Sequence, residues 1–196
     1  MRAHYHYMDF PSPFGTFHIV WDPSDEKHPL RRIFLSTHAE TSLIRMNRRY
    51  PDISFLASAR IRNLGQLITS FLEGDPVSLE KIPLDLNRFS PFQAAVLKAE
   101  RQVPAGNVTT YSRLAKFVNS PRAARAVGHA LAENPFPLLI PCHRVVHSDG
   151  ALGGYQGGSD MKMRLLERES VPFTPDGKVC MSAKALFLCP HKGLGK

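Results

Sequence analysis

The sequence has few cysteines and no long apolar run. Three cysteines are an odd number, so they cannot form a complete set of intramolecular disulfides, and a reducing compartment is expected. No segment approaches the length of a membrane-spanning helix, and the N-terminal stretch MRAHYHYMDF is too polar for a signal peptide. These absences predict a protein without a membrane partner, located in the cytoplasm or, in a eukaryote, in the nucleus.

Metal-binding patterns are also missing. Cys180, Cys189 and His191 lie in the C-terminal tail, at spacings that do not match those of known zinc sites. We therefore expect no metal in the tail, and no other cofactor is indicated.

Basic charge is concentrated in the second half of the chain. Residues 1–86 contain ten Lys or Arg and ten Asp or Glu, whereas residues 87–170 contain eleven and six, and residues 171–196 four and one. A basic surface confined to one half indicates a polyanionic partner. A merely solvated surface explains the same charge equally well.

Residues 1–86 predict a small α/β domain. The segments FGTFHIVWD (14–22) and LRRIFLS (30–36) have the pattern of paired strands, and residues 39–50 and 59–74 have that of helices. Gly74 is expected to end the second helix. Its predicted apolar face holds Leu64, Leu67, Ile68 and Phe71.

Residues 87–171 predict a second, mostly helical domain. Helices are expected at residues 90–103, 110–118 and 121–134, and the last two, joined by a short turn, form a helix-turn-helix. Ser90 and Ser120 have the position of N-caps, each followed by a proline. Residues 172–196 contain scattered Pro and Gly and predict a poorly ordered tail. The fold class is therefore α/β, with a small sheet first and a helical domain after it.

The third predicted helix combines small and cationic side chains. Arg122 and Arg125 are long, whereas most of their neighbours are Ala or Gly. Such a helix can lie close to a sugar-phosphate backbone, although tight packing on a neighbouring helix explains the small residues too. Few side chains suited to base-edge readout are present, which favours binding to many DNA sequences over binding to one.

The segment LLIPCHRVVHSDG (138–150) places Cys142 between an apolar run, His143 and Arg144. A cysteine is often only a small buried side chain. Here Pro141 predicts an extended approach, and two neighbouring cations are expected to lower the pKa of the thiol. Neighbours on an extended chain point to opposite sides, so His143 is expected to reach the sulfur through a water.

The segment PCHRV, preceded by AVGHALAENPFPLLI and followed by GALGGYQGG and KMRLLERE, resembles the O6-alkylguanine-DNA alkyltransferases (methylated-DNA–protein-cysteine methyltransferases). The resemblance covers residues 90–170, and the first domain is similar only through SPFGTFHIVW. It implies direct-reversal DNA repair, in which an alkyl group moves irreversibly from guanine O6 to Cys142 after base flipping. The implied partner is double-stranded DNA, bound through its minor groove by a monomer. Activity on O4-alkylthymine depends on the volume of the pocket.

The resemblance also implies roles for single residues. His143 takes the thiol proton through a water, and Glu169 orients His143. Tyr111 crowds the target phosphate and donates to guanine N3, and Arg125 enters the vacated base stack. The other implied DNA-contacting residues are Ser120, Arg122, Ala123 and Ala124.

A further implied group forms the guanine pocket. Asn134 is the hinge between the recognition helix and the cysteine segment, the Val145 carbonyl accepts from the guanine amino group, and Tyr155 walls the pocket. The backbone N–H of Gln156 points at O6, although many relatives have serine at this position. Arg144 and Gly157 complete the set.

Some relatives carry a zinc site built partly from cysteines in the first domain. Residues 1–86 contain no cysteine, so no such zinc is expected. Two alternative functions stay open at this point. An alkyltransferase-like damage sensor lacks the acceptor cysteine, whereas this chain has Cys142. A helix-turn-helix regulator predicts a preferred DNA sequence.

Overall fold

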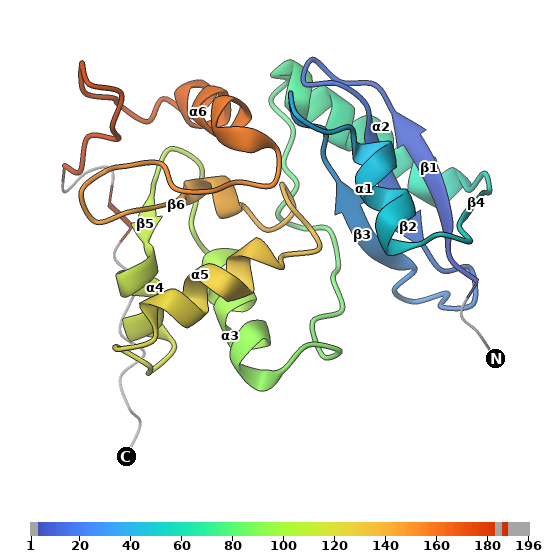
Figure 1. Ribbon diagram of the computed structural model, residues 1–196, viewed down its shortest axis with the longest axis horizontal. Coiled ribbons are helices and arrows are strands. Elements are labelled where there is room, and N and C mark those ends of the chain that lie inside the picture. Colours follow the sequence, from blue (N-terminus) through green and yellow to red (C-terminus); the bar gives the residue numbers. More distant parts are fainter. Residues whose placement is uncertain (1–3, 183–185, 188–196) are drawn as a thin grey trace. The chain divides into compact units, whose positions relative to one another are not determined.

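The computed structural model describes residues 4–182, 186 and 187 (Figure 1). They form two compact units: the first runs to Asp85 and includes residues 135–139 and 156–158, and the second holds the rest. The first unit contains a four-stranded sheet with helices, and the second is mostly helical. The predicted α/β fold class is confirmed.

The sheet of the first unit has the strand order β3-β2-β1-β4. β2 (Phe17–Trp21) and β3 (Leu30–Phe34) pair antiparallel, which confirms the predicted strand pair. β1 (His6–Phe10) lies antiparallel to β2, and the short β4 (Ser54–Phe55) runs parallel to β1. The sequence analysis missed β1 and β4.

One helix lies against each face of this sheet (Figure 1). α1 (Ser42–Arg49) begins after the N-cap Thr41, and its Met46 packs with Val20 and Phe34. α2 (Ala59–Glu73) begins after the N-cap Ser58 and contacts β1 and β2 on the other face. All five residues of β2 are therefore buried.

The buried face of α2 differs from the predicted one. The buried residues of α2 are Ile61, Gly65, Ile68 and Leu72, whereas Leu64, Leu67 and Phe71 are only half-buried. Gly65 is the reason, because the ring of Phe10 occupies the space beside it and turns this stripe toward the core. Gly74 ends the helix at a φ of 104°, as predicted.

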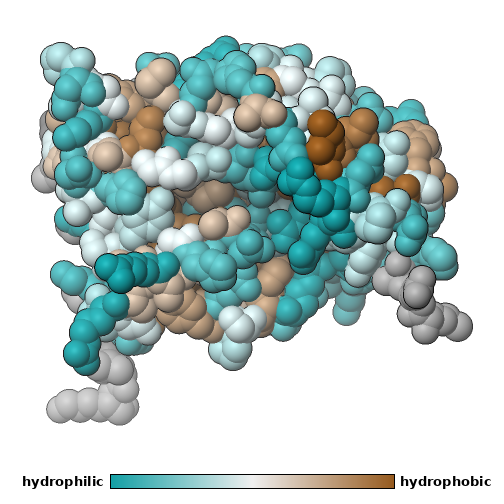
Figure 2. Space-filling view, in the orientation of Figure 1, coloured by the Kyte–Doolittle hydropathy of each residue, from teal (hydrophilic) through white to brown (hydrophobic). Residues whose placement is uncertain are grey.

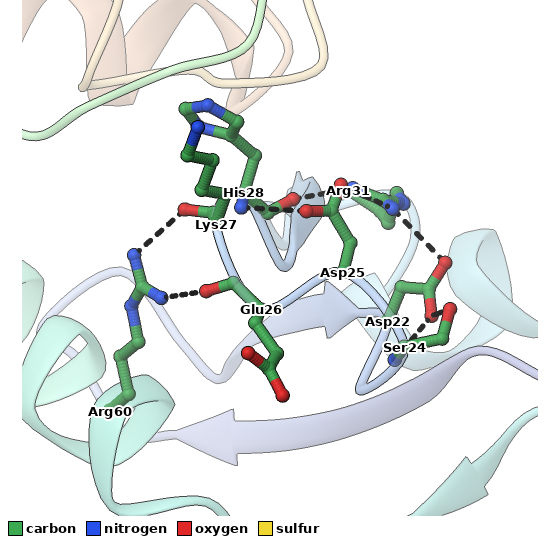
Figure 3. A network of polar contacts seen from close by, with 8 residues as sticks. All are labelled: Asp22, Ser24, Asp25, Glu26, Lys27, His28, Arg31 and Arg60. Carbon is green, nitrogen blue, oxygen red and sulfur yellow. Dashed lines mark hydrogen bonds and ion pairs between the residues drawn. The ribbon is translucent and has the colours of Figure 1, made fainter.

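The connection between β2 and β3 is held by two arginines (Figure 3). The Arg31 guanidinium forms ion pairs with Asp22 and Asp25, both at 3.0 Å. Arg60 of α2 donates to the carbonyl oxygens of Glu26 and Lys27, at 2.6 and 3.1 Å. This polar connection therefore joins the edge of the sheet to the first turn of α2.

Three packed helices open the second unit: α3 (Pro91–Glu100), α4 (Tyr111–Phe117) and α5 (Ala124–Ala132). They confirm the three predicted helices and the helix-turn-helix, with one correction. Ser120 is not the N-cap of α5, because residues 120–123 form a turn in which the Ala123 N–H donates to the Ser120 carbonyl at 2.8 Å. α5 thus begins three residues after the predicted start.

The remaining elements hold the cysteine segment. β5 (Thr109–Thr110) pairs parallel with β6 (Val145–Val146), and α6 (Gly158–Arg168) follows. The expectation of a poorly ordered tail is wrong for residues 172–182, 186 and 187. Phe173, Val179, Met181 and Leu186 pack on a core that includes Val108, Val146 and Leu166.

Some apolar side chains of the first unit stay exposed. Figure 2 shows brown apolar atoms over the region of α1. Large exposed apolar residues in the described part of the chain are Leu43, Ile44, Phe55 and Leu56. None of the described helices is long and apolar enough to cross a membrane.

No group of three or more His, Cys, Asp and Glu within residues 4–182, 186 and 187 is arranged to hold a metal ion. Cys189 and His191 lie outside the described residues.

Substituting Gly65 tests the packing of α2 on the sheet. A Cβ at this position would lie 2.1–2.4 Å from carbons of the Phe10 ring. Gly65→Ala should therefore lower the free energy of unfolding by about 1–3 kcal/mol, the usual cost of overpacking. Urea unfolding measures this, with the exposed neighbour Gln66→Ala as control. Equal stability of the two variants would contradict this packing.

Candidate active site

Cys142 lies in a short 3-10 turn, Cys142–Arg144, in the second unit. The Arg144 N–H donates to the Pro141 carbonyl at 2.8 Å, so the chain turns at the cysteine. The predicted extended geometry is therefore wrong at this point. Proline has no N–H to extend a strand ladder, and the turn that follows directs Cys142 inward, to an exposed fraction of 8%.

Asn134 joins the sulfur to the helix-turn-helix. It lies two residues after the end of α5, and its N–H donates to the Leu131 carbonyl of that helix at 3.1 Å. Its Nδ2 donates to the Ile140 carbonyl at 3.2 Å and to the Cys142 sulfur at 3.3 Å. With an exposed fraction of 1%, this side chain fixes the cysteine turn against the end of α5.

His143, Arg144 and Glu169 form one buried polar cluster. His143 Nε2 lies 2.9 Å from Glu169 Oε1, and the Arg144 guanidinium donates to both Glu169 oxygens, at 2.7 to 3.1 Å. Burial opposes ionisation of Glu169, but the hydrogen bonds from His143 and Arg144 outweigh it and lower its pKa to about 2. Glu169 is therefore an anion that holds both neighbours of the cysteine.

The second ring nitrogen of His143 is left for other chemistry. The side chain is fully buried, and Nδ1 has no hydrogen-bond partner among the described residues. Burial lowers the pKa of His143, although Glu169 acts in the opposite direction. A neutral imidazole held through Nε2 can take a proton at Nδ1.

The prediction that flanking cations acidify the thiol is wrong. Burial and, after it, the Glu100 charge together raise the pKa of Cys142 to about 12, against the hydrogen bond from Asn134 and the charge of Lys162. Arg144 does not reach the sulfur, because its guanidinium binds Glu169 and donates to the Val103 carbonyl at 2.6 Å. Arg144 thus binds Glu169 and the Val103 carbonyl, and its expected place in the guanine pocket stays a prediction.

Lys162 of α6 is a cation whose charge lowers the pKa of Cys142. It is fully buried, and its ammonium donates to the carbonyl oxygens of Val145, Leu152 and Gly154. The Val145 oxygen, expected to accept from a guanine amino group, already accepts from Lys162 at 2.7 Å. A carbonyl oxygen has two lone pairs, so one acceptor position stays open for a second donor.

Tyr111 and Tyr155 approach the same segment. The Tyr111 hydroxyl lies so close to Gly153 that a Cβ there would be 2.8 Å from it, and the ring stacks at a tilt on His147, with centroids 5.2 Å apart. The Tyr155 ring meets His143 edge-on, with centroids 6.1 Å apart. Its hydroxyl is buried and makes no hydrogen bond within the described chain.

α5 and the turn before it present a surface of cationic and small side chains. Arg122 and Arg125 are exposed, and Ser120, Ala123 and Ala124 are half-buried beside them. Val127, Ala130 and Leu131 face inward. Small residues of α5 thus lie both on its buried side and near the exposed arginines. Tight packing on a neighbouring helix and close approach to a sugar-phosphate backbone are therefore compatible explanations for them.

Gln156 and Gly157 belong to the first unit. There the Arg45 guanidinium donates to the Gln156 carbonyl at 2.7 Å. Cys142, His143, Glu169, Tyr111, Tyr155, Asn134, Arg144 and Val145 all lie in the second unit.

Comparison with known proteins finds relatives that match most of this chain. Residues 91–171 match the family described as 6-O-methylguanine DNA methyltransferase, DNA binding domain. A methylated-DNA–protein-cysteine methyltransferase from Metallosphaera sedula is 38% identical over 163 residues, 83% of this chain and 92% of the relative. The chain belongs to the methylated-DNA–protein-cysteine methyltransferase family.

Other members of this methyltransferase family match over a shorter stretch. The protein from Methanothermobacter thermautotrophicus is 46% identical over 112 residues, 57% of this chain. The chain spans between 54% and 62% of the length of that relative and of several others. The structure of Mycobacterium tuberculosis OGT in complex with DNA is 30% identical with a TM-score of 0.63, covering 84% of this chain and 93% of that one.

The sequence analysis missed two buried ionisable side chains of this methyltransferase family member. Glu100 and Lys162 are both fully buried. A signal was present: Glu100 follows the buried Val96 and Leu97 by four and three residues, and Lys162 precedes the buried Leu165 and Leu166 by the same spacings. A charged residue at an apolar position of a helix marks a buried ionisable group.

Replacing Glu169 tests the buried cluster. Its pKa of about 2, against 4.5 for an ordinary glutamate, means that the carboxylate contributes stability at neutral pH, and this contribution is lost as the pH falls toward 2. Glu169→Gln should lower the free energy of unfolding by about 3 kcal/mol at pH 7, and the difference from the wild type should shrink below pH 4.5. Urea titrations at several pH values measure it.

The exposed Glu167→Gln is the matched control and should change stability little. A Glu169→Gln loss that stays constant from pH 7 to the acid limit would contradict an ionised Glu169 as its source.

Proposed function

We propose that this protein repairs DNA by moving an alkyl group from O6 of alkylguanine to the sulfur of Cys142. One observation carries this proposal: the buried Cys142 sulfur is bound by Asn134 at the end of the helix-turn-helix and is followed by a histidine that is held by a buried glutamate. The family membership and the DNA complex of a related structure support the choice of substrate.

The reaction is a single displacement. The thiol proton passes through a water to His143 Nδ1, while Glu169 holds Nε2 and stabilises the imidazolium that forms. The thiolate then attacks the alkyl carbon, and the bond from that carbon to O6 breaks with its electron pair passing to guanine. The guanine anion that leaves takes up one proton from solvent, and the imidazolium returns one proton to solvent. The product is S-alkylcysteine.

The raised pKa of Cys142 fits a thiol that is ionised only when a substrate is present. A pKa of about 12 means that very little thiolate exists at neutral pH, so general electrophiles find little to react with. An everted guanine brings both the alkyl carbon and hydrogen-bonding groups to the site. Deprotonation and attack are then coupled at the moment of transfer.

The helix-turn-helix supplies the DNA-binding surface of this proposal. The exposed Arg125 enters the space that the flipped base leaves, Tyr111 supports the turned nucleotide, and the small residues of α5 let the helix approach the minor groove. The minor groove offers a degenerate pattern, which suits a repair protein that must act in any sequence. A monomer is sufficient for this arrangement.

The acceptor acts once. A thioether does not release its alkyl group without a strong nucleophile. Transfer is therefore stoichiometric. Methyl is the simplest substrate group, and the range of larger groups and of O4-alkylthymine follows from the room beside the sulfur.

Intact-protein mass spectrometry tests the proposal. After incubation with excess duplex DNA that contains O6-methylguanine, the wild type should gain the mass of one methyl group and no more. Cys142→Ser should gain none, because it lacks the acceptor while keeping the DNA-binding surface. More than one methyl removed per protein would contradict a single-use acceptor.

The same samples separate the alternatives. A damage sensor would bind methylated duplex and leave the methyl on guanine, so the wild type would keep its mass. A sequence-specific regulator would bind one undamaged duplex much more tightly than unrelated ones. The proposal predicts equal affinity for unrelated undamaged duplexes.

A further inference from the structure

The last residue of α3 is a fully buried carboxylic acid. Glu100 has an exposed fraction of 0%, and neither of its side-chain oxygens has a hydrogen-bond partner among the described residues. Buried carboxylates in proteins are nearly always paired with a cation or hydrogen-bonded. This side chain therefore requires an explanation that packing alone does not supply.

The buried cations of the unit do not hydrogen-bond to Glu100. The Lys162 ammonium has three N–H groups, and the carbonyl oxygens of Val145, Leu152 and Gly154 accept from it. The Arg144 guanidinium donates to Glu169 and Val103. Ionised Glu100 would thus be a buried anion near these cations but without a direct contact to them.

The charges around the sulfur depend on the state of Glu100. Arg144 and Glu169 form an ion pair, and burial lowers the pKa of His143. Among the buried residues that the structure describes in this unit, Lys162 is therefore the cation without an anionic hydrogen-bond partner, and burial lowers its own pKa to about 8. From α4, Tyr111 faces the cluster, and from the glycine-rich loop Tyr155 does. On α5, which packs on α3, the cationic Arg125 and the titratable His129 are exposed to solvent.

We propose that Glu100 is a positioning residue of the alkyl-acceptor site, which must carry its proton for Cys142 to react. The neutral acid leaves the Lys162 charge free to stabilise the thiolate, whereas the carboxylate cancels that charge and opposes the thiolate directly. Loss of this one proton therefore stops alkyl acceptance at alkaline pH. This inference rests on the proposed function of Cys142.

The electrostatics of the unit agree with this placement. Burial raises the pKa of Glu100 to about 8, although Lys162 and Arg144 act in the opposite direction. Glu100 is also the largest contributor after burial to the raised pKa of Cys142. The acid is thus protonated at neutral pH and loses its proton within a range that can be tested.

Comparison of the wild type with Glu100→Gln tests the inference, because glutamine imitates the neutral acid and does not ionise. Two rates are measured from pH 6.5 to 9: methyl transfer from O6-methylguanine duplex, and carboxamidomethylation of Cys142 by iodoacetamide, followed by peptide mass. The ratio of the variant rate to the wild-type rate should be near one at pH 6.5. It should rise to about tenfold at pH 9, where roughly one wild-type molecule in ten keeps the proton.

Two further variants complete this experiment. Glu73→Gln is the control, since Glu73 is likewise the last residue of its helix but is exposed, and its ratio should stay near one at every pH. Glu100→Leu replaces the acid with an apolar side chain, and its ratio should rise with pH as that of Glu100→Gln does. A ratio that stays flat for both Glu100 variants overturns the inference; this result is also expected if Lys162 causes the alkaline loss.

The two readouts distinguish the inference from the proposed function. Methyl transfer to wild-type Cys142 with a flat ratio would remove the role of Glu100 and leave the function intact. No methyl transfer, together with an iodoacetamide ratio that rises with pH, would remove the function and keep the effect of Glu100 on the sulfur.

Stability offers a measurement that does not use the thiol. A group whose pKa rises on folding binds its proton more tightly in the folded state, so its contribution is complete below pH 4.5 and is lost as the pH rises through about 8. The urea midpoint of the wild type should therefore fall relative to that of Glu100→Gln between pH 5 and 8. Parallel midpoints would contradict a buried, protonated Glu100.

Discussion

The ionised Glu169 carboxylate is the interaction on which the rest of the site depends. It accepts from His143 and Arg144, which follow Cys142 directly, and it lies just beyond the end of α6. A single carboxylate thus fixes both residues that follow the sulfur in its turn. Removing it would leave a buried guanidinium without its anion, which proteins tolerate poorly.

The site combines a strong burial cost with few charges. Cys142, His143 and Glu100 are all disfavoured in their charged forms by burial, whereas Glu169 is kept ionised by two direct hydrogen-bonding partners. Glu169 is therefore a permanent anion, whereas Cys142, His143 and Glu100 are neutral in the folded protein unless they lose or gain a proton. Asn134 connects this arrangement to the end of α5, because one side chain binds both the Ile140 carbonyl and the Cys142 sulfur.

Local patterns in the sequence predicted the elements well. Gly74 as a helix end, the strands β2 and β3 and the helix-turn-helix were all indicated by turn residues and periodicity, because these signals act over a few neighbours. Ser120 failed as an N-cap since the residues after it form a turn first. Residues 172–182, 186 and 187 of the tail were misjudged because their scattered apolar side chains gain their partners only from distant parts of the unit.

The contacts and pKa values of the site residues were harder to predict than the identity of these residues. The resemblance named Cys142, His143 and Glu169, but charge counting along the chain assigned Arg144 to the sulfur, whereas in space it serves Glu169. The raised pKa of the thiol comes from burial, which no neighbour in the sequence reveals. Glu100 and Lys162 show the same limit, since their shared environment depends on how α3 and α6 pack in one unit.

The central claim is that the acceptor sulfur rests as a neutral thiol and is ionised only in the presence of its substrate. The most direct test is an NMR titration of protein labelled with ¹³C at the cysteine Cβ, with the Cys142 signal assigned by its absence in Cys142→Ser. The account predicts no ionisation of Cys142 in the free protein between pH 6 and pH 10, consistent with a pKa of about 12. A thiolate formed near neutral pH in the free protein would contradict it.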